Sequence, residues 1–482
     1  MIKDKRKRIF IAVVTIVVVG VGGFIIQRGH RKNKKKPNII FILIDALRAD
    51  RLGLYGYNRD VSPAIDDIAS EGVTFERPIS QAPWTQPSMA SIFCGQYVGV
   101  HKVVDYSLVQ NIRRKKLEKI AVFNESFVTL AEVLRDNGYT TAGFSANPLT
   151  VQEYGFAQGF EHYEDRNSLK SSRGNILNTK FIEWLGQRDR AKPFFVYLHY
   201  MDVHGPYYAR DEFVRPLMEE VEKMPYKRRL TSLAKSRLGG YAKGRAGVIA
   251  NQYANLSDYL EFWSALYDAG IREMNYHIAK LAGKLREMNL WDDAYVIITA
   301  DHGEELYERG MWNHGVSLYD TELYVPLVLR WRENLPADRR VSGTVRLIDL
   351  MPTIMEQLDI PMMEDLQGRS LIGDINRYLP AKPVAAYSEG VKFKPNQSTV
   401  YIGDWKVIAD TSRKKYQLYN IAEDLQEKVN LSAKYPEKTQ SLVEVINEQK
   451  VINEQLGKGI SVKEAALTPE QYKRLKSLGY VE

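Results

Sequence analysis

Short apolar runs that end in polar residues are the feature that most constrains how this 482-residue chain can fold. The clearest is NIIFILID at 38–45, and similar runs are FFVYL at 194–198 and AYVIITA at 294–300. Continuous apolar runs of this length are typical of strands that are buried on both faces of a parallel sheet. Helical patterns lie between the runs, the longest at 256–288. The alternation predicts an α/β domain with a mostly parallel sheet.

The pattern changes after about residue 380. Short antiparallel strands are expected at 401–409 and 416–419, and a polar helix at 438–456. The sequence therefore predicts a main α/β domain at 37–380 and a smaller C-terminal α+β subdomain at 381–482.

Residues 9–26 form an uncharged, mostly apolar run, IFIAVVTIVVVGVGGFII, with basic residues on both sides. Its length is at the short end for a membrane-spanning helix and exceeds the usual core of a signal peptide. No small-x-small cleavage site follows the run. The sequence thus predicts an uncleaved membrane anchor with a basic linker at 1–36. A cleaved signal and a core segment are the alternatives.

Charge and cysteine content limit the kinds of binding site and cross-link that the chain can form. The formal net charge is +8, but residues 1–36 contain eleven Lys or Arg and a single Asp. The body after residue 36 has no excess of basic residues, so a basic nucleic-acid-binding face on it is not expected. The one cysteine, Cys94, excludes an intrachain disulfide framework and a zinc site built from several cysteines.

Polar side chains follow three of the apolar runs. In an open parallel sheet, ligands bind beyond the carboxyl ends of the strands. Carboxylates and imidazoles together suit a divalent ion of the Zn²⁺ or Mn²⁺ class, and Mg²⁺ or Ca²⁺ where oxygen ligands dominate. The alternative is that an Asp after a strand only caps the next helix. The residues at these positions are Asp45, the pair Asp301–His302, and the group His199, Asp202 and His204.

A hydroxyl lies in the segment PWTQPSMASIFCG, where Thr85 precedes a short helix expected at 88–94. Backbone N–H groups in the first turn of a helix are free, and the helix dipole is positive there. A metal can lower the pKa of such a hydroxyl, and the N–H groups can stabilise an oxyanion. Thr85 is therefore a candidate nucleophile, although a threonine at this place can also serve only as the N-cap of the helix.

The order of these segments resembles the sulfatase family of the alkaline-phosphatase-like superfamily. PNIIFILIDALRADRLGLYGY is similar to the family's opening strand and loop, and APWTQPSMASIFCGQY to its nucleophile segment. LHYMDVHGPY and VIITADHGEEL resemble two later metal and substrate segments, followed by NHGVSLYDTELYVPLVLR and the ending LTPEQYKRLKSLGYVE. The resemblance implies an alkaline-phosphatase-like three-layer sandwich, with 37–380 as the catalytic domain of an ester hydrolase.

The resemblance also implies roles for individual residues. Thr85 matches the nucleophile position. His204 and His314 match histidines that contact the transferred group or the leaving oxygen. His199 and Asp202 are expected to be structural supports. The residues that match metal ligands, with the Thr85 hydroxyl close by, are Asp45, Asp301 and His302.

Four departures from the family pattern change the expected chemistry. Family sulfatases oxidise a Cys or Ser to formylglycine, which Thr85 cannot form, and Met89 replaces the arginine that steadies that group. Ala46 stands where a second acid usually follows the first strand, and Asp301–His302 replaces the Asp–Asn pair of calcium sulfatases. A Thr nucleophile with Asp–His ligands is similar instead to the phosphotransferase and phosphodiesterase branches, which use manganese or zinc. One divalent ion (Mn, Zn, Ca or Mg) and no formylglycine are expected.

These features predict a metal-dependent hydrolase of sulfate or phosphate esters. Its substrate would be a sulfated or phosphorylated small molecule, glycan or lipid head group. Two alternatives stay open: a membrane-anchored transferase that moves a phospho-substituent from a lipid head group onto a glycan, and an inactive homologue that only binds. The resemblance and the N-terminal run together predict a single-pass cell-membrane protein with an extracytoplasmic catalytic domain. No nucleic-acid partner is expected.

Overall fold

The computed structural model describes residues 36–104, 119–169, 173–222, 256–377, 383–392, 394 and 396–478. The chain divides into Met1–Pro37 and a compact unit, Asn38–Glu482, to which the fold belongs. Within the described ranges, no helix has the length and apolar character needed to cross a membrane. The expected single-pass membrane location is contradicted by this finding. The segment 9–26, on which that expectation rested, lies outside the described residues.

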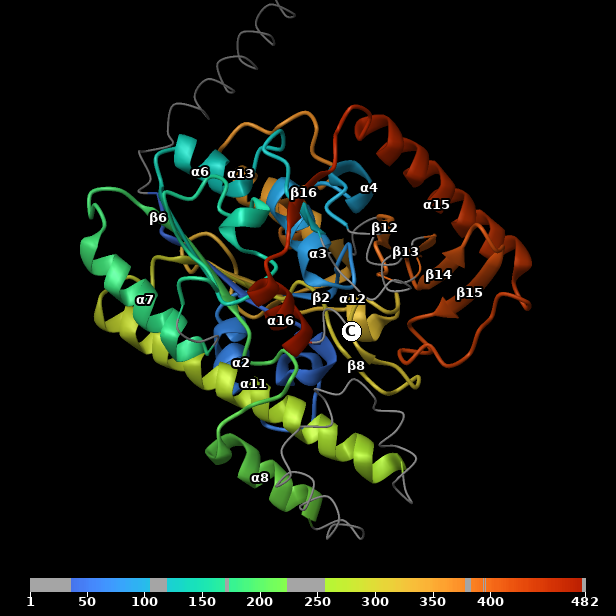
Figure 1. Cartoon of the computed structure of the whole chain (residues 1–482), viewed down its shortest axis with the longest axis horizontal. Coiled ribbons are helices and arrows are strands. Elements are labelled where there is room, and N and C mark those ends of the chain that lie inside the picture. The colour runs from blue at the N-terminus through green and yellow to red at the C-terminus, as the bar shows by residue number, and fades with distance from the viewer. Residues whose placement is uncertain are drawn as a thin grey trace, which may run out of the picture. The chain divides into compact units, whose positions relative to one another are not determined.

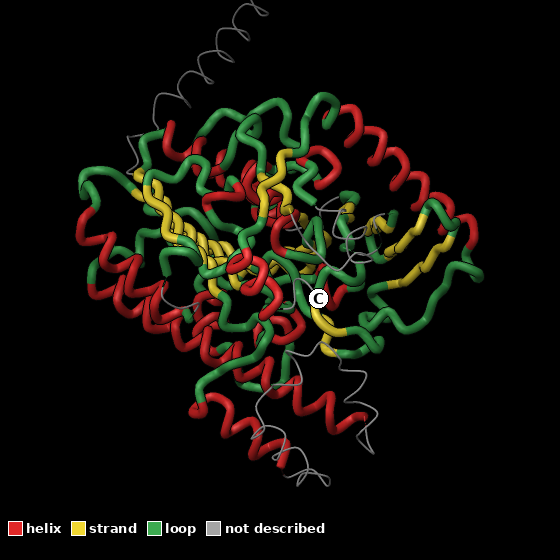
Figure 2. Tube along the Cα trace, in the orientation of Figure 1, coloured by secondary structure: helices red, strands yellow, loops and turns green. Residues whose placement is uncertain are grey.

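A sheet of eight strands forms the centre of the fold (Figure 2). Strand β10 is antiparallel to both of its neighbours, and the remaining pairs are parallel. The predicted mostly parallel sheet is thus confirmed. Across the sheet the strands are β11 (Arg339–Arg346), β2 (Val73–Ile79), β10 (Leu327–Arg330), β7 (Tyr295–Thr299), β1 (Ile39–Ile44), β6 (Phe194–Tyr200), β4 (Thr140–Ser145) and β5 (His162–Glu164).

Helices cover both faces of this sheet, which gives the expected three layers (Figure 1). On one face lie α2 (Pro63–Ser70), α7 (Gly174–Gln187) and α11 (Leu256–Glu287), with α8 (Asp211–Glu222) against α11. On the other lie α3 (Thr85–Cys94), α6 (Leu130–Asp136) and α13 (Leu350–Gln357). Shorter elements are α4 (Val98–His101), α12 (Asp320–Leu323), α14 (Ile372–Ile375) and the small pair β8 (Glu305–Leu306) and β9 (Trp312–Asn313).

The register of the central strands brings their carboxyl ends together. In β1, Leu43 lies between His199 of β6 and Thr299 of β7. All six β1 residues are buried and apolar, so a shift of β1 out of this register would need to expose or repack them. Asp45 therefore leaves the sheet next to Asp301, as the position of polar residues at the strand ends predicted.

The C-terminal part forms a separate antiparallel sheet of β12 (Ala386–Glu389), β13 (Gln397–Ile402), β14 (Trp405–Asp410) and β15 (Lys415–Asn420). Helix α15 (Pro436–Leu456) packs on it. The single strand expected at 401–409 is instead the end of β13 and most of β14, because the chain turns at Gly403, whose φ is +57°.

The last described residues return to the main body. Strand β16 (Lys463–Ala466) pairs with β3 (Lys119–Val122), and α16 (Pro469–Ser477) follows it. The domain boundary expected between 380 and 381 stays a prediction.

Candidate active site

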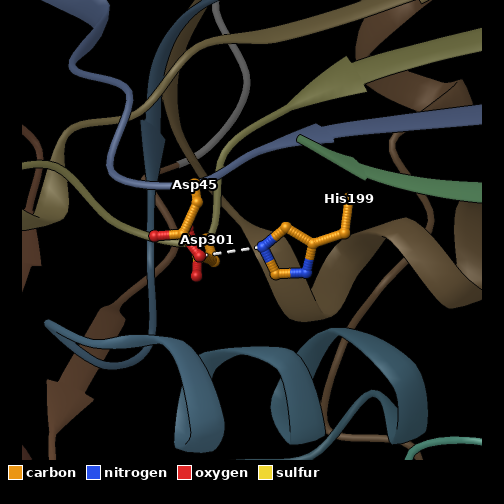
Figure 3. A group of neighbouring side chains, drawn as sticks. All are labelled: Asp45, His199 and Asp301. Atoms are coloured by element: carbon orange, nitrogen blue, oxygen red, sulfur yellow. Dashed lines mark hydrogen bonds and ion pairs between the residues drawn. The ribbon is translucent and has the colours of Figure 1, made fainter. Parts of the chain in front are cut away.

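Asp45 and Asp301, which follow β1 and β7, converge with His199, which lies near the carboxyl end of β6 (Figure 3). Asp45 Oδ2 lies 2.8 Å from His199 Nε2 and accepts a hydrogen bond of 2.5 Å from Asn147 Nδ2. Asp301 Oδ1 accepts hydrogen bonds from the backbone N–H groups of His302 (3.0 Å) and Ala46 (3.3 Å). Asp45 and Asp301 are fully buried, so this is an interior polar centre.

His302 directs its second ring nitrogen at this centre. Its Nδ1 lies 2.8 Å from the carbonyl oxygen of Gly303, which can only accept, so Nδ1 carries the proton. The lone pair on Nε2 then faces Thr85 Oγ1 at 3.2 Å, Asp301 Oδ2 at 3.4 Å and Asp45 Oδ1 at 3.6 Å. A backbone carbonyl that fixes the tautomer in this way is typical of a metal-ligating histidine.

The donor atoms fit a divalent cation. Ligands around a tetrahedral ion with bonds of about 2.0–2.2 Å lie roughly 3.3–3.6 Å apart, and the three distances from His302 Nε2 fall in or near this range. Asp45 Oδ1 and Asp301 Oδ2 are buried and have no hydrogen-bond partner among the described residues. The residues that would hold the ion are therefore Asp45, Asp301 and His302, with Thr85 Oγ1 beside them and His199 in reach of Asp45.

The charges at this centre also favour a bound cation. Burial raises the pKa of the Asp301 carboxyl well above its usual range, and the neighbouring charge of Asp45 raises it further. Burial also opposes ionisation of Asp45, but the surrounding histidines, His204 first, outweigh it and hold the pKa of Asp45 below its usual range. Without a cation, the negative charge of each carboxylate opposes ionisation of the other. A divalent cation would allow both to ionise.

His204 and His314 face the same centre. Their ring centroids are 4.9 Å apart, and the ring centroid of His314 lies 4.3 Å from that of His302, with the two rings tilted by 37°. His204 Nε2 lies 3.9 Å from Asp45 Oδ1, while its Nδ1 hydrogen-bonds to the carbonyl oxygen of Gly205. Burial lowers the pKa of both imidazoles, so both are neutral near pH 7. The structure thus brings together every residue for which the sequence predicted a catalytic or ligand role.

Thr85 is the first residue of α3, not its N-cap, which is Trp84. The helix begins three residues earlier than expected, and Thr85 Oγ1 faces His302 and Asn147 Nδ2 (3.4 Å). Met89, one turn further on, is fully buried and contacts the Tyr197 hydroxyl through its sulfur (3.9 Å). It fills an apolar position here.

His199 and Asp202, expected as supports, lie in different places. His199 Nδ1 is 2.6 Å from the Tyr197 hydroxyl, and its Nε2 reaches Asp45. Asp202 lies in a second cluster with Glu273 and His277.

Two residues near the centre were missed. Asn147 follows β4 just as Asp45 follows β1, so the rule about strand ends could have found it. Lys392 comes from the C-terminal part, between β12 and β13. Its side chain is buried, passes over Gly315 next to His314, and places Nζ 5.0 Å from the ring centroid of Trp84, next to Thr85. No spacing in the sequence connects it to the site.

The fold and this polar centre define the alkaline-phosphatase-like superfamily. Residues 37–360 match the family model described as Sulfatase, and the chain belongs to the sulfatase family. It is a sulfatase-like ester hydrolase.

Relatives of known type are distant in sequence. The chain is 23% identical to arylsulfatase K of Mus musculus over 463 residues, covering 86% of this chain and 80% of that protein. It superposes with a TM-score of 0.67 and 20% identity on a structure solved in complex with D-glucosamine-2-N,6-O-disulfate, covering 87% and 99% of the two chains. The phosphonate monoester hydrolase of Agrobacterium radiobacter gives a TM-score of 0.65 at 18% identity, covering 87% and 96%.

Proposed function

We propose that this protein hydrolyses sulfate or phosphate esters with Thr85 as the nucleophile, at a divalent-metal centre formed by Asp45, Asp301 and His302. The observation that carries the proposal is the position of Thr85 Oγ1, 3.2 Å from His302 Nε2 at the first turn of α3. When bound, the ion supplies positive charge that lowers the pKa of this hydroxyl. The dipole at the start of α3 favours negative charge at the same place.

The proton balance of the first step points to His204. As the Thr85 Oγ–sulfur or Oγ–phosphorus bond forms and the ester bond breaks, the hydroxyl loses a proton and the leaving oxygen gains one. His204 is neutral and its Nδ1–H is committed to Gly205, so its Nε2 lone pair can take up a proton and return it. His314, hydrogen-bonded through Nδ1 to Glu304 Oε1 at 3.2 Å, would contact the transferred group.

The second step differs from that of formylglycine enzymes. An aldehyde hydrate has a second hydroxyl that can expel the bound group, whereas Thr85 has one. The Thr85–O–sulfur or –phosphorus bond must therefore be broken by water, whose oxygen leaves with the product and whose proton passes through His204 to the departing Thr85 oxygen. Two displacements in sequence are a normal course for covalent catalysis.

Lys392 is proposed to attract the anionic group of the substrate. Gly315 has a φ of +77°, and a Cβ there would lie 2.8 Å from Lys392 Cδ, so the lysine stem passes directly over the backbone beside His314. The ammonium group lies against the face of Trp84. A cation in this place offers a charge-assisted hydrogen bond to a sulfate or phosphate oxygen.

The substrate class is proposed from the neighbours' chemistry. One structural neighbour holds a disulfated glucosamine and another a neocarrahexaose, while a third is a phosphonate monoester hydrolase. We infer a sulfated or phosphorylated saccharide for this chain.

Mass spectrometry of the intact protein tests the nucleophile. Wild-type protein and Thr85→Ala are mixed with an aryl sulfate, an aryl phosphate and an aryl phosphodiester, and quenched in acid. We expect a sulfuryl or phosphoryl adduct on the Thr85 peptide of the wild type and none on the variant. Turnover by wild type and Thr85→Ala at equal rates would refute the proposal.

A further inference from the structure

A second carboxylate–imidazole cluster lies outside the proposed active site. Glu273 and His277 are one turn apart on α11, and Asp202 comes from the loop after β6. His277 Nε2 is 3.6 Å from Glu273 Oε1 and 3.7 Å from Asp202 Oδ1, and the three donor atoms lie within 4.8 Å of one another. Their side chains are 3–4% exposed. Helices α7 and α11 run side by side here (Figure 1).

Two potential ligand atoms of the cluster have no hydrogen-bond partner in the part of the chain that the structure describes. His277 Nε2 and Asp202 Oδ2 are buried without a hydrogen-bond partner among the described residues. The distances of 3.6 and 3.7 Å are too long for hydrogen bonds. They are close to the roughly 3.3–3.6 Å that separates two ligands of a tetrahedral ion with bonds of about 2.0–2.2 Å.

We propose that Asp202, Glu273 and His277 bind a second divalent cation of the Zn²⁺ or Mn²⁺ class. Two carboxylates with one imidazole are a ligand set suited to these ions. Two of the three donors are one turn apart on one helix, so the backbone of α11 fixes their spacing before any ion binds.

Neighbouring groups hold the donors in this arrangement. Asp202 Oδ1 accepts a hydrogen bond from the backbone N–H of Gly174 (3.1 Å). A Cβ on Gly174 would lie 2.9 Å from His277 Cδ2, so the imidazole is packed tightly against the start of α7. Such contacts from outside the ligand set orient metal ligands.

Arg210 also binds Glu273, and this contact leaves lone pairs on the Glu273 carboxylate for a metal ion. Arg210 donates from Nε to Oε1 (2.7 Å) and from its backbone N–H to Oε2 (2.8 Å). A carboxylate has about four lone-pair sites, so each oxygen keeps one. Arg210 compensates the charge of Glu273, whereas no Lys or Arg among the described residues pairs with Asp202.

A cavity beside the cluster leaves room for the remaining ligands. It has a volume of about 380 Å³, and Glu273 and His277 are among the residues lining it. Water from this cavity would complete the coordination. The bound ion would tie the loop at 201–206, which carries His204, to α11, and would act as a positioning element for that loop.

Metal content measured on the full chain tests the proposal independently of the proposed active site. Wild type, Asp45→Ala/Asp301→Ala, His277→Gln and the triple combination are incubated with ZnCl₂ or MnCl₂, desalted and measured by plasma mass spectrometry. We expect two equivalents in the wild type, one in the double variant, one in His277→Gln and none in the triple variant. Lys280→Ala, which changes the cavity wall but no ligand, should keep both.

Thermal unfolding of the same variants tests the proposal even where a variant is less stable than the wild type. The ion should raise the Tm of the double variant and leave that of the triple variant unchanged. The second site would be overturned if adding His277→Gln to the double variant changed neither the metal count nor the effect of the ion on Tm. A metal count unaffected by Asp45→Ala/Asp301→Ala alone would count against the proposed catalytic centre and leave the second site standing.

Discussion

The two carboxylate–imidazole clusters each take a side chain from the segment 199–204, and they differ in what surrounds those groups. In the first, Asp45 and Asp301 lie beside a hydroxyl at the start of a helix, that of Thr85. In the second, Glu273 is paired with Arg210, and the described residues that line the adjacent cavity include no Ser, Thr or Cys.

This difference shows that a ligand set does not by itself make a reactive centre. Both clusters have the donor atoms for a divalent ion, and the first also places the Thr85 hydroxyl and two further imidazoles, His204 and His314, around them. We therefore expect changes in the first cluster to affect turnover and changes in the second to affect metal content and stability.

The largest effect is expected for Thr85→Ala. Loss of the nucleophile should lower kcat by at least about a thousandfold, since removing one catalytic nucleophile abolishes covalent catalysis. Metal content should stay close to that of the wild type, because three stronger ligands remain. Thr85→Ser should keep part of the activity, since it retains the hydroxyl. The measurement is kcat on aryl sulfate and aryl phosphate at matched metal occupancy.

Ser88→Ala is the matched control for that variant. It removes a buried hydroxyl from the same helix, one that donates to the Asp301 carbonyl oxygen at 2.7 Å. Its effect on kcat should be less than about tenfold. Equal losses in Thr85→Ala and Ser88→Ala would mean that Thr85 is structural.

The next effect concerns Asp301. Burial raises the pKa of its carboxyl, so protons compete with a cation for this group. Metal affinity should therefore increase with pH, and calorimetry in buffers of different ionisation enthalpy should detect the released proton. Asp301→Asn should lose that proton release and weaken binding of the first ion by at least about a hundredfold. Affinity that does not change with pH would contradict this assignment.

Much of the fold could be predicted because buried strands have a simple pattern. Strands β1, β6 and β7 are apolar on both faces, and their sequences contain few polar residues. Strand β2, VTFERPI, was missed since it lies next to the edge strand β11 and includes the charged, partly buried pair Glu76 and Arg77. Its pairing is decided by tertiary contacts that no local pattern encodes.

The same reasoning explains what could be predicted of the site. Asp45 and Asp301 follow strands whose order was clear from the sequence, so their meeting was predictable. Lys392 reaches the site from another sheet, and Glu273 and His277 are two polar residues among many on a long helix. Their neighbours depend on how the C-terminal part and α11 pack, which no local pattern encodes.

A smaller effect is expected for Lys392. Burial lowers the pKa of its ammonium group to about 8, against the opposing pull of Glu322 and Glu304. The group is therefore charged at neutral pH and loses its charge as the pH rises through about 8, so kcat/KM for an anionic ester should fall above that pH.

Lys392→Met should lower kcat/KM at pH 7 by roughly ten- to a hundredfold, the value of a hydrogen bond to a charged group. It should also abolish the decline above pH 8. Lys394→Met, two residues on and bonded to the Val316 carbonyl oxygen at 3.3 Å, is the control and should keep the wild-type profile. If kcat/KM of Lys392→Met still declines above pH 8 as in the wild type, the decline belongs to a group other than Lys392.

The smallest effect on turnover, and the sharpest contrast with Thr85→Ala, is expected for His277→Gln. This variant removes a donor of the second cluster but no group that faces the proposed nucleophile, so kcat should fall by roughly fivefold or less. An ion present at about 100 times its Kd contributes about 2.7 kcal/mol to the free energy of unfolding, and that contribution should be lost. In the presence of a chelator, wild type and variant should therefore unfold at similar temperatures, whereas added metal should separate them. If His277→Gln instead lowers kcat as much as Thr85→Ala does, the two clusters form one functional unit, and the contrast drawn between them is wrong.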